Sequence, residues 1–344
     1  MKALLSTDLH LLPNQIELSK RVLEMIKVNS YKYLTPGEDK IILPGDIFHF
    51  KNTIHTNVQK LFEKFLLEMS KDFQVIVLVG NHDWGIPYKT HSLQAYKNLN
   101  ENIIIVDDIY RDGKHGFIPY YREKELFHEK LKELGDIEYL YGHLDINGFQ
   151  IGSGWEEYSE DFSSVEDFKK YKKVISGHLH LAQEKVVEGT EYIYIGTAYT
   201  TSFSETDQKK RFIIMDMDTG EWEEYDTGLT LHKTIEINAS EELPEIPKED
   251  LDKGVSYRVI ITGTREEIDQ RIDLKNQKYP ARINYNFINK ERTRIELKTT
   301  DTVEETINKF TEKQLKRVYD ENHNFDINKL LKIGKKYAKW KELE

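Results

Sequence analysis

The feature that most constrains the fold is an aliphatic run that ends in polar residues. Residues 75–79 are all aliphatic, and Gly80, Asn81, His82 and Asp83 follow them directly. A short β-branched run without a polar residue predicts a buried strand, which the glycine ends. An amide, an imidazole and a carboxylate therefore leave the carboxyl end of a buried strand together, where open α/β sheets bind ligands. Taken alone, the triplet is equally typical of an ordinary turn.

Four other predicted strands end in residues of the same kind. They cover residues 2–7, 41–44, 137–141 and 173–176, and the polar residues after them are Asp8 with His10, Asp46 with His49, His143, and His178 with His180. Side chains two residues apart on an extended segment point to the same side, so such a pair can reach one ion. Six of the twelve histidines lie at these five strand ends. We assign the other six, which have no such context, to surface or structural positions.

Composition narrows the chemistry of such a site. The chain of 344 residues contains no cysteine, so a bound metal must be held by His, Asp, Asn or Glu. Two carboxylates, one amide and several imidazoles suit Mn²⁺, Fe²⁺ or Zn²⁺ in a pair of sites. One carboxylate shared between two ions roughly 3.5–4 Å apart is the usual way to hold such a pair.

Charge and hydropathy limit the partners and the compartment. The net charge of -11 argues against a general affinity for nucleic acid. It does not exclude a local phosphate site, because bound divalent cations invert the field around them. The aliphatic start of the chain is too short for a signal peptide, and no stretch approaches the roughly 18 apolar residues of a membrane-spanning helix. We therefore expect a cytoplasmic protein without membrane contact.

The order of the predicted elements indicates one large domain and a smaller one. Strands and helices alternate at first, with helices over residues 15–28 and 122–134, and strands dominate later. The acidic segment 239–254 contains two prolines and no clear period, which predicts a boundary. We expect a large domain over residues 1–238, a small α+β domain over 239–300 and a helical tail over 301–344.

The residues at the five strand ends resemble a known set of motifs. In order and spacing they match those of the calcineurin-like metallophosphoesterases, namely Asp8-x-His10, Gly45-Asp46, Gly80-Asn81-His82-Asp83, His143 and Gly177-His178-x-His180. His49, the segment 195–197, the small domain and the tail narrow the resemblance to the SbcD type. That type is the nuclease subunit of the double-strand-break repair and recombination exonuclease, including its bacteriophage versions. The resemblance implies an α/β (α+β) fold: a two-sheet β-sandwich flanked by helices, a small α+β capping domain and a C-terminal helical tail.

The resemblance also implies a role for each residue. Two divalent ions are expected, Mn²⁺ or alternatively Mg²⁺, with Asp46 bridging them. Asp8, His10, Asp46 and His180 would hold one ion, and Asp46, Asn81, His143 and His178 would hold the other. His82 would contact the scissile phosphate and protonate the leaving 3′ oxygen, with His49 in support. This agrees with the need for an acid that titrates near neutrality. Asp83 is expected to fix its loop rather than bind metal.

The implied function is a Mn²⁺-dependent DNA nuclease, acting as an exonuclease on duplex ends and an endonuclease on single-stranded or hairpin DNA. It would be a homodimer that docks onto an SbcC-type coiled-coil ATPase through the amphipathic helices of residues 301–344. Candidate phosphate contacts, each of which could equally belong to a solvated face, are Arg258, Lys275, Lys278 and Arg282. One alternative is another phosphodiesterase or phosphatase of the same family that acts on a small phosphoester. The other is a non-catalytic DNA-binding subunit, which would be expected to lack a ligand, and none is missing.

Overall fold

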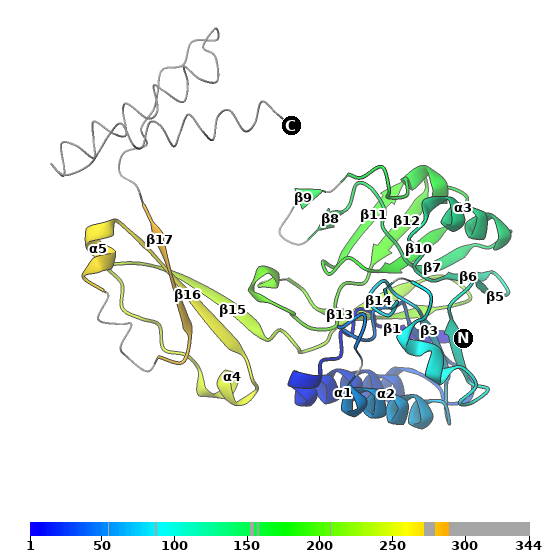
Figure 1. Cartoon of the computed structure of the whole chain (residues 1–344), viewed down its shortest axis with the longest axis horizontal. Helices are drawn as coiled ribbons and strands as arrows, with labels where there is room; N and C mark the ends of the chain where they lie inside the picture. Colours follow the sequence, from blue (N-terminus) through cyan, green and yellow to red (C-terminus); the bar gives the residue numbers. More distant parts are fainter. Residues whose placement is uncertain are drawn as a thin grey trace, which may run out of the picture. The chain divides into compact units, whose positions relative to one another are not determined.

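Buried aliphatic runs form the strands of two six-stranded mixed sheets in the computed structural model of the chain (Figure 1). The structure describes residues 1–53, 55–86, 88–151, 155–156, 158–206, 208–271 and 279–288, with the backbone alone at 155–156. The predicted fold class, a two-sheet sandwich flanked by helices, is confirmed.

The first sheet has the strand order β14-β13-β1-β2-β3-β4. Its parallel strands are β1 (Lys2–Leu5), β2 (Lys40–Leu43), β3 (Gln74–Leu78) and β4 (Ile103–Val106). β13 (Arg211–Asp216) pairs antiparallel with β1, and β14 (Trp222–Asp226) pairs antiparallel with β13. Parallel strands that are buried on both faces carry continuous aliphatic runs, which is why these strands are visible in the sequence.

The second sheet has the strand order β11-β12-β10-β7-β6-β5. Its parallel strands are β6 (His115–Ile118), β7 (Tyr139–His143), β10 (Lys173–Gly177) and β12 (Thr190–Tyr194). Antiparallel strands close both edges, namely β5 (Tyr110–Asp112) and β11 (Gln183–Val187). Between β7 and β10 in the sequence, β8 (Gln150–Ile151) and β9 (Trp155–Glu156) form a two-stranded ribbon.

Three apolar layers join the helices and the sheets. α1 (Ile16–Tyr33) and α2 (Thr56–Met69) cover the outer face of the first sheet (Figure 1). α3 (Lys124–Glu133) covers the outer face of the second sheet. The layer between the sheets is built from both of them and includes Leu5, Ile42, Ile76, Tyr141, Ile175 and Ile193. Because side chains alternate along a strand, each buried strand serves two layers at once, and this fixes its register.

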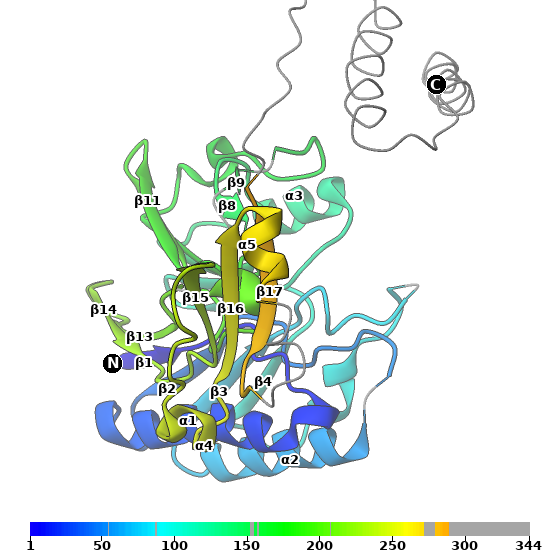
Figure 2. The ribbon, with the colours of Figure 1, turned by 90° about the vertical axis from the view of Figure 1, so that its left-hand side faces the viewer.

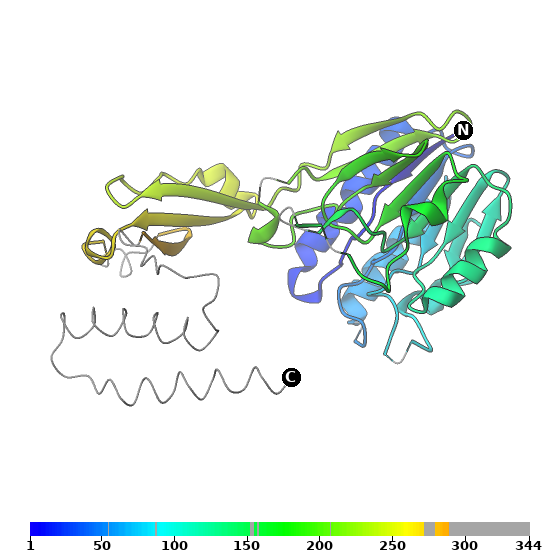
Figure 3. The same ribbon diagram turned by 90° about the horizontal axis from the view of Figure 1, so that it is seen from above.

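A third sheet has the strand order β15-β16-β17 (Figure 2, Figure 3). Its strands are β15 (His232–Asn238), β16 (Ser256–Gly263) and β17 (Arg282–Phe287), and the short helices α4 (Lys248–Asp252) and α5 (Arg265–Asp269) belong to the same region. Within the described residues the chain forms two compact units, one of residues 1–236, 243–260 and 279–284, the other of 237–242, 261–271 and 285–288. The domain boundaries at residues 239 and 301 stay predictions, and the tail over 301–344 lies outside the described residues.

Several elements differ from the sequence-based expectation, among them β5, β8, β9 and α4, which were not expected. The helix expected over residues 15–28 continues to Tyr33, because the buried Ser30 hydroxyl donates to the Ile26 carbonyl oxygen and the Leu34 amide donates to the Ser30 carbonyl oxygen. Strand β15 was not expected, and it contains no fully buried residue: five of its seven residues are partly buried and two are exposed. In the part of the chain that the structure describes, no helix combines the length and apolarity needed to cross a bilayer.

Candidate metal centre

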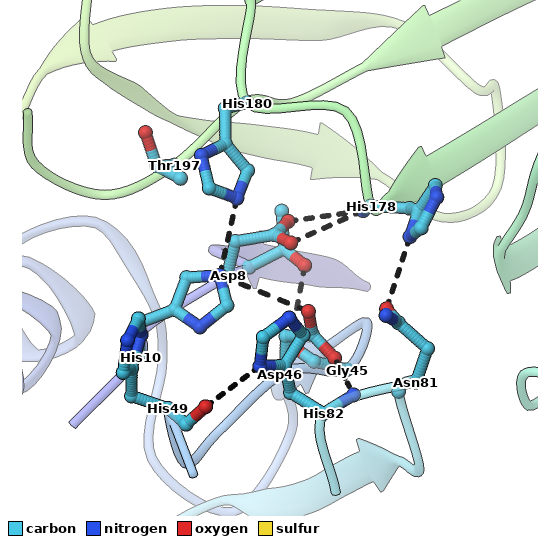
Figure 4. A network of polar contacts seen from close by, with 12 residues as sticks. Asp8, His10, Gly45, Asp46, His49, Asn81, His82, His178, His180 and Thr197 are labelled. Atoms are coloured by element: carbon cyan, nitrogen blue, oxygen red, sulfur yellow. Dashed lines mark hydrogen bonds and ion pairs between the residues drawn. The ribbon is translucent and has the colours of Figure 1, made fainter. Parts of the chain in front are cut away.

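The five predicted strand ends meet at one edge of the two sheets (Figure 4). Asp8, Asp46 and the Asn81-His82 pair follow the neighbouring parallel strands β1, β2 and β3. His143 ends β7, and His178 follows the adjacent parallel strand β10. The carboxyl ends of parallel strands lie at the same edge, so topology alone gathers these side chains. The His178 amide donates to the Asp8 carboxylate over 3.1 Å, which joins the two sheets at this point.

The backbone is strained at four of the predicted ligands. Asp8, His10, Asp46 and His178 have positive φ angles of 51°, 38°, 53° and 87°. Among non-glycine residues such angles are uncommon and cost of order 1–3 kcal/mol each, and they cluster where function over-determines the conformation. Strain at four residues of three strand ends therefore indicates a functional site.

Two glycines allow the strand ends to approach one another. A Cβ atom on Gly80 would lie 2.3 Å from the Asp46 Oδ1 atom. A Cβ atom on Gly45, whose φ angle is +95°, would lie 2.4 Å from the His143 Nδ1 atom. Both distances are far below van der Waals contact, so the glycines next to the motifs are required by close packing around Asp46.

One cluster of ligand atoms consists of Asn81, His143, His178 and one oxygen of Asp46. The His143 Nε2 atom lies 2.9 Å from Asn81 Oδ1, 3.2 Å from His178 Nδ1 and 3.3 Å from Asp46 Oδ1. His143 Nδ1–H donates to the Pro44 carbonyl oxygen over 2.8 Å, which leaves Nε2 with a lone pair in the neutral imidazole. With His143 neutral and the amide in this orientation, acceptor atoms thus converge on one point, where either a proton on His143 Nε2 or a metal ion can satisfy them.

The pKa values of His143 and Asp46 also indicate that this cluster favours a positive charge. Burial alone would lower the pKa of His143, but the Asp46 carboxylate opposes burial and raises that pKa to about 10. Burial would likewise raise the pKa of Asp46, yet His143 and His10 hold it well below its usual range. A carboxylate that is ionised and almost fully buried requires a neighbouring cation, and a metal ion meets that requirement as well as a proton.

The second cluster consists of Asp8, His10 and His180. The His10 Nε2 atom lies 3.1 Å from the His180 Nε2 atom, and the ligand atoms of all three residues lie within 4.8 Å of one another. Burial lowers the pKa of His10 well below its usual value, so this imidazole is neutral and can act as a ligand. Among the described residues, no lysine or arginine lies within 4.0 Å of the buried Asp8 or Asp46 carboxylates.

Asp46 faces both clusters. Its Oδ1 atom is 3.3 Å from His143 Nε2, and its Oδ2 atom is 3.7 Å from His10 Nε2. The two oxygens of one carboxylate thus point to the two groups of ligands, which is the geometry that a bridging ligand needs. The donor set fits a pair of divalent ions, with Asp8, His10 and His180 around one, Asn81, His143 and His178 around the other, and Asp46 between them.

Two carboxylates behind the clusters were missed by the sequence reasoning. The His180 Nδ1–H group donates to Glu205 Oε1 over 2.8 Å, and the His178 Nε2–H group donates to Asp145. Such carboxylates fix the tautomer and the orientation of metal-binding imidazoles. Asp145 stands two residues after His143, a spacing that could have suggested it, whereas nothing in the sequence around Glu205 does.

Glu205 is itself held by a buried lysine. The Lys210 Nζ atom lies 2.8 Å from Glu205 Oε2, and both side chains are buried. Burial would raise the pKa of Glu205, but the hydrogen bond from His180 and the charge of Lys210 keep it far below its usual range. The carboxylate is therefore ionised when it accepts the proton of His180 Nδ1.

His82 lies beside the two clusters. Its ring stands edge-on to the His10 ring with centroids 4.9 Å apart, and the ring nitrogens of His10, His49 and His82 lie within 4.8 Å of one another. The His82 Nδ1–H group donates to the backbone carbonyl oxygen of His49 over 2.6 Å, and its amide donates to Asp46 Oδ1 over 2.8 Å (Figure 4). The ring is thereby oriented with Nε2 available. The His49 and His82 ring centroids stand 5.8 Å apart, and the support expected from the His49 side chain stays a prediction.

The buried Asp83 carboxylate joins two of the site loops. It accepts hydrogen bonds from the amides of Ile47, Phe48 and Gly80 at 3.0–3.2 Å. Burial and the nearby Asp46 raise its pKa to about 7 despite these donors. The contacts are those of a loop-fixing residue, as expected from the sequence.

Of the four predicted phosphate contacts, two lie within the described residues. The Arg258 guanidinium donates to the Thr234 hydroxyl and to the Phe203 carbonyl oxygen, and it lies over the Phe203 ring at 5.1 Å. Arg282 is exposed on β17. Lys275 and Lys278 lie outside the described residues. The DNA-binding role of all four stays a prediction.

Comparison with known proteins identifies the family of the chain and several of its relatives. The family described as calcineurin-like phosphoesterase matches residues 1–182, more than half of the chain. Exonuclease subunit 1 of Enterobacteria phage T4 is 26% identical over 277 residues, which span 75% of this chain and 72% of the phage protein. Uncharacterized protein R555 of Acanthamoeba polyphaga mimivirus is 24% identical over 191 residues, and there the match spans 50% of this chain but 14% of the relative.

A solved structure of an archaeal phosphodiesterase has a TM-score of 0.36 and 17% sequence identity, covering 66% of this chain and 99% of that one. The family resemblance expected from the motifs is confirmed by the family match.

Proposed function

Because the chain belongs to the calcineurin-like phosphoesterase family, and so to a class of metal-dependent phosphoester hydrolases, we propose that it is a Mn²⁺-dependent DNA nuclease. It would act as an exonuclease on duplex ends and as an endonuclease on single-stranded or hairpin DNA, in repair and recombination. The observation that carries the proposal is the pair of ligand clusters that share the Asp46 carboxylate, with His82 beside them.

The side chains around the centre have separate tasks in this proposal. When bound, a pair of divalent ions activates water and neutralises the charge that develops on phosphorus. Asp46 holds the two ligand clusters together, and Glu205 and Asp145 hold His180 and His178 in their orientations. His82, anchored through its Nδ1–H group, presents Nε2 to the phosphoester and supplies the proton that the leaving 3′ oxygen needs.

A nucleic acid is favoured over a small phosphoester by the T4 relative, which is named an exonuclease subunit and matches over three quarters of this chain. Family membership alone is equally compatible with a phosphatase or another phosphodiesterase. A non-catalytic role is disfavoured, because every predicted ligand is present and the structure brings them together.

The SbcC-type ATPase partner and the homodimer also belong to this proposal. Their support is the resemblance in the sequence of the small domain and the tail, together with the expected apolar faces of the tail helices. Residues 301–344 would form the docking segment for the ATPase.

The proposal is tested with the purified full-length chain and three labelled DNAs: a hairpin, a blunt duplex and a single strand. We expect cleavage with Mn²⁺, no cleavage in excess EDTA, and no cleavage by the His82→Ala variant. Hydrolysis of p-nitrophenyl phosphate is measured in parallel. Rapid turnover of that monoester without cleavage of any of the three DNAs would replace the nuclease by the phosphatase alternative.

A further inference from the structure

A pocket of about 420 Å³ opens directly beside the metal centre. Its wall includes the ligand His143 and the neighbouring Asp145, so whatever is attached to a phosphate at the centre can reach it. The other lining residues are Tyr120, Tyr121, Arg122, Lys124, Phe127 and Phe162 with Leu144, Asp161 and Ser163. Its size falls in the range of small-molecule sites, about 300–1,000 Å³.

Tyr120 is the wall residue that is tied most firmly to the centre. It follows β6, which is parallel to β7, and therefore stands at the same sheet edge as His143. Its amide donates to the Val79 carbonyl oxygen, and its own carbonyl oxygen accepts from Trp84 Nε1–H. These bonds attach Tyr120 to both ends of the loop that carries Asn81 and His82. Its ring stacks on the His178 ring with centroids 6.1 Å apart.

The charges on the wall cancel. Two basic side chains, Arg122 and Lys124, stand against two acidic ones, Asp145 and Asp161. Asp145 is already engaged with His178, Lys124 donates to the Glu160 carbonyl oxygen, and Arg122 lies over the Tyr88 ring at 5.1 Å. Burial raises the pKa of Tyr120 to about 12, so its phenol is neutral. A second phosphate group would find no net positive charge here, whereas an uncharged planar group finds four aromatic side chains among the lining residues, namely Tyr120, Tyr121, Phe127 and Phe162.

We propose that this pocket binds the base of an unpaired nucleotide adjoining the scissile phosphodiester. The inference rests on the proposed function, and it adds that the site selects DNA whose bases are unpaired. Aromatic side chains bind bases by stacking, with little preference for sequence. A base inside a duplex is stacked and paired, so it must leave the helix to enter the pocket. The centre then cuts single strands, hairpin loops and frayed ends in preference to the interior of a duplex.

The first test compares two small diesters that share a leaving group: the p-nitrophenyl ester of thymidine 5′-monophosphate and methyl p-nitrophenyl phosphate. We expect the full-length chain to hydrolyse both with Mn²⁺, and only one of them carries a base. Stacking of a base against aromatic side chains changes affinity by roughly 5- to 150-fold. We expect the thymidine ester to have a KM lower by a factor in that range.

The second test uses variants of the wall. Tyr120→Leu and Phe162→Leu should reduce the KM advantage of the thymidine ester, and Tyr120→Phe should keep it. Tyr31→Leu is the matched control, because Tyr31 is an exposed aromatic residue on α1 that donates to Asp72, away from the sheet edge of the centre. Calorimetric titration with Mn²⁺ verifies that each variant still binds metal. If Tyr120→Leu does not fold, the Phe162→Leu variant and the KM values of the two diesters with the wild-type protein decide whether the pocket binds a base.

The third test places one abasic residue at successive positions of a cleavable single strand. Cleavage should weaken strongly when the abasic residue adjoins the scissile bond, and this effect should disappear in Tyr120→Leu. Equal KM values for the two diesters, together with position-independent cleavage of the abasic strands, would refute the proposal that the pocket binds a base. The proposal that the chain is a nuclease would then still stand. A preference for the thymidine ester without cleavage of any DNA would refute the proposed nuclease function and would still support base binding by the pocket.

Discussion

Glu205 offers the sharpest test of the metal centre, because it acts on one cluster through one hydrogen bond. It accepts from His180 Nδ1–H over 2.8 Å, and His180 belongs to the Asp8 and His10 cluster. In Glu205→Gln the hydrogen-bond acceptor remains and the negative charge is lost. We expect weaker Mn²⁺ binding at this cluster and unchanged binding at the cluster of Asn81 and His143.

The magnitude follows from what else Glu205 binds. Loss of a carboxylate partner behind a metal-binding histidine typically weakens metal affinity by about 10- to 100-fold. The Glu205 charge is already shared with Lys210 at 2.8 Å, so it polarises His180 less than an unpaired carboxylate would. We therefore expect about a tenfold loss, which is about 1.4 kcal/mol.

The experiment needs a control for Lys210, because Glu205→Gln leaves the charge of this buried lysine without its partner. Its side chain is fully buried, and removal of one partner of a buried ion pair typically costs about 3–5 kcal/mol of unfolding free energy. The double variant Glu205→Gln, Lys210→Met removes the unpaired charge and should recover most of that loss without restoring metal affinity. Asp145→Asn is the matched variant for the other cluster, since Asp145 contacts His178.

The assay is calorimetric titration of metal-free protein with Mn²⁺, analysed as two sites, with electron paramagnetic resonance to follow bound Mn²⁺. Glu205→Gln should weaken one site, and Asp145→Asn should weaken the other. Unchanged affinity at both sites in a folded Glu205→Gln protein would refute the positioning role of this carboxylate. Equal weakening of both sites by either variant would refute the assignment of the two histidines to separate ions.

Four further predictions concern the same centre and the tail. Asp46→Ala should lose both ions, seen as a metal content near zero by mass spectrometry, and an intact metal pair in that variant would contradict a bridging carboxylate. His82→Ala should keep both ions and lose roughly 10²- to 10⁴-fold in turnover, which a kcat measurement at saturating substrate checks. Gly80→Ala should weaken metal binding, because its Cβ atom would lie 2.3 Å from Asp46 Oδ1; affinity equal to wild type would show that the loop can yield. Deletion of residues 301–344 should leave nuclease activity intact and abolish co-purification with the ATPase, and undiminished co-purification would refute docking through the tail.

The predicted ligands lie close together in the structure because the topology places them at one edge. Aliphatic runs such as residues 75–79 identify the buried strands, and parallel pairing then brings their carboxyl ends to one edge. Asp145 and Glu205, in contrast, were not predicted from the sequence. They contact the ligands from loops whose paths depend on tertiary packing, and an isolated acidic residue in a loop carries no periodicity. The half-exposed β15 is missed for the same lack of pattern.

The pocket beside the centre shows a further limit of sequence reasoning. Tyr120, Arg122 and Phe162 come from two segments that carry no motif, and they become a wall only because β6 and β7 are parallel neighbours. Aromatic residues after a strand are more often core than ligand contacts. The distances around Tyr120, and not its residue type, single it out.

The charge of the centre itself would reconcile the net charge of -11 with the proposed DNA substrate. Without ions, the two clusters present the Asp8 and Asp46 carboxylates, with Asp145 and Glu205 behind them. Lys210 and the His143 imidazole, whose pKa the Asp46 carboxylate raises to about 10, oppose this negative charge. This assembly is negative and repels a phosphodiester. Two divalent ions add four positive charges and invert its sign, while the rest of the surface stays acidic. If DNA is the substrate, as proposed, its affinity should depend on the metal before any bond is cut.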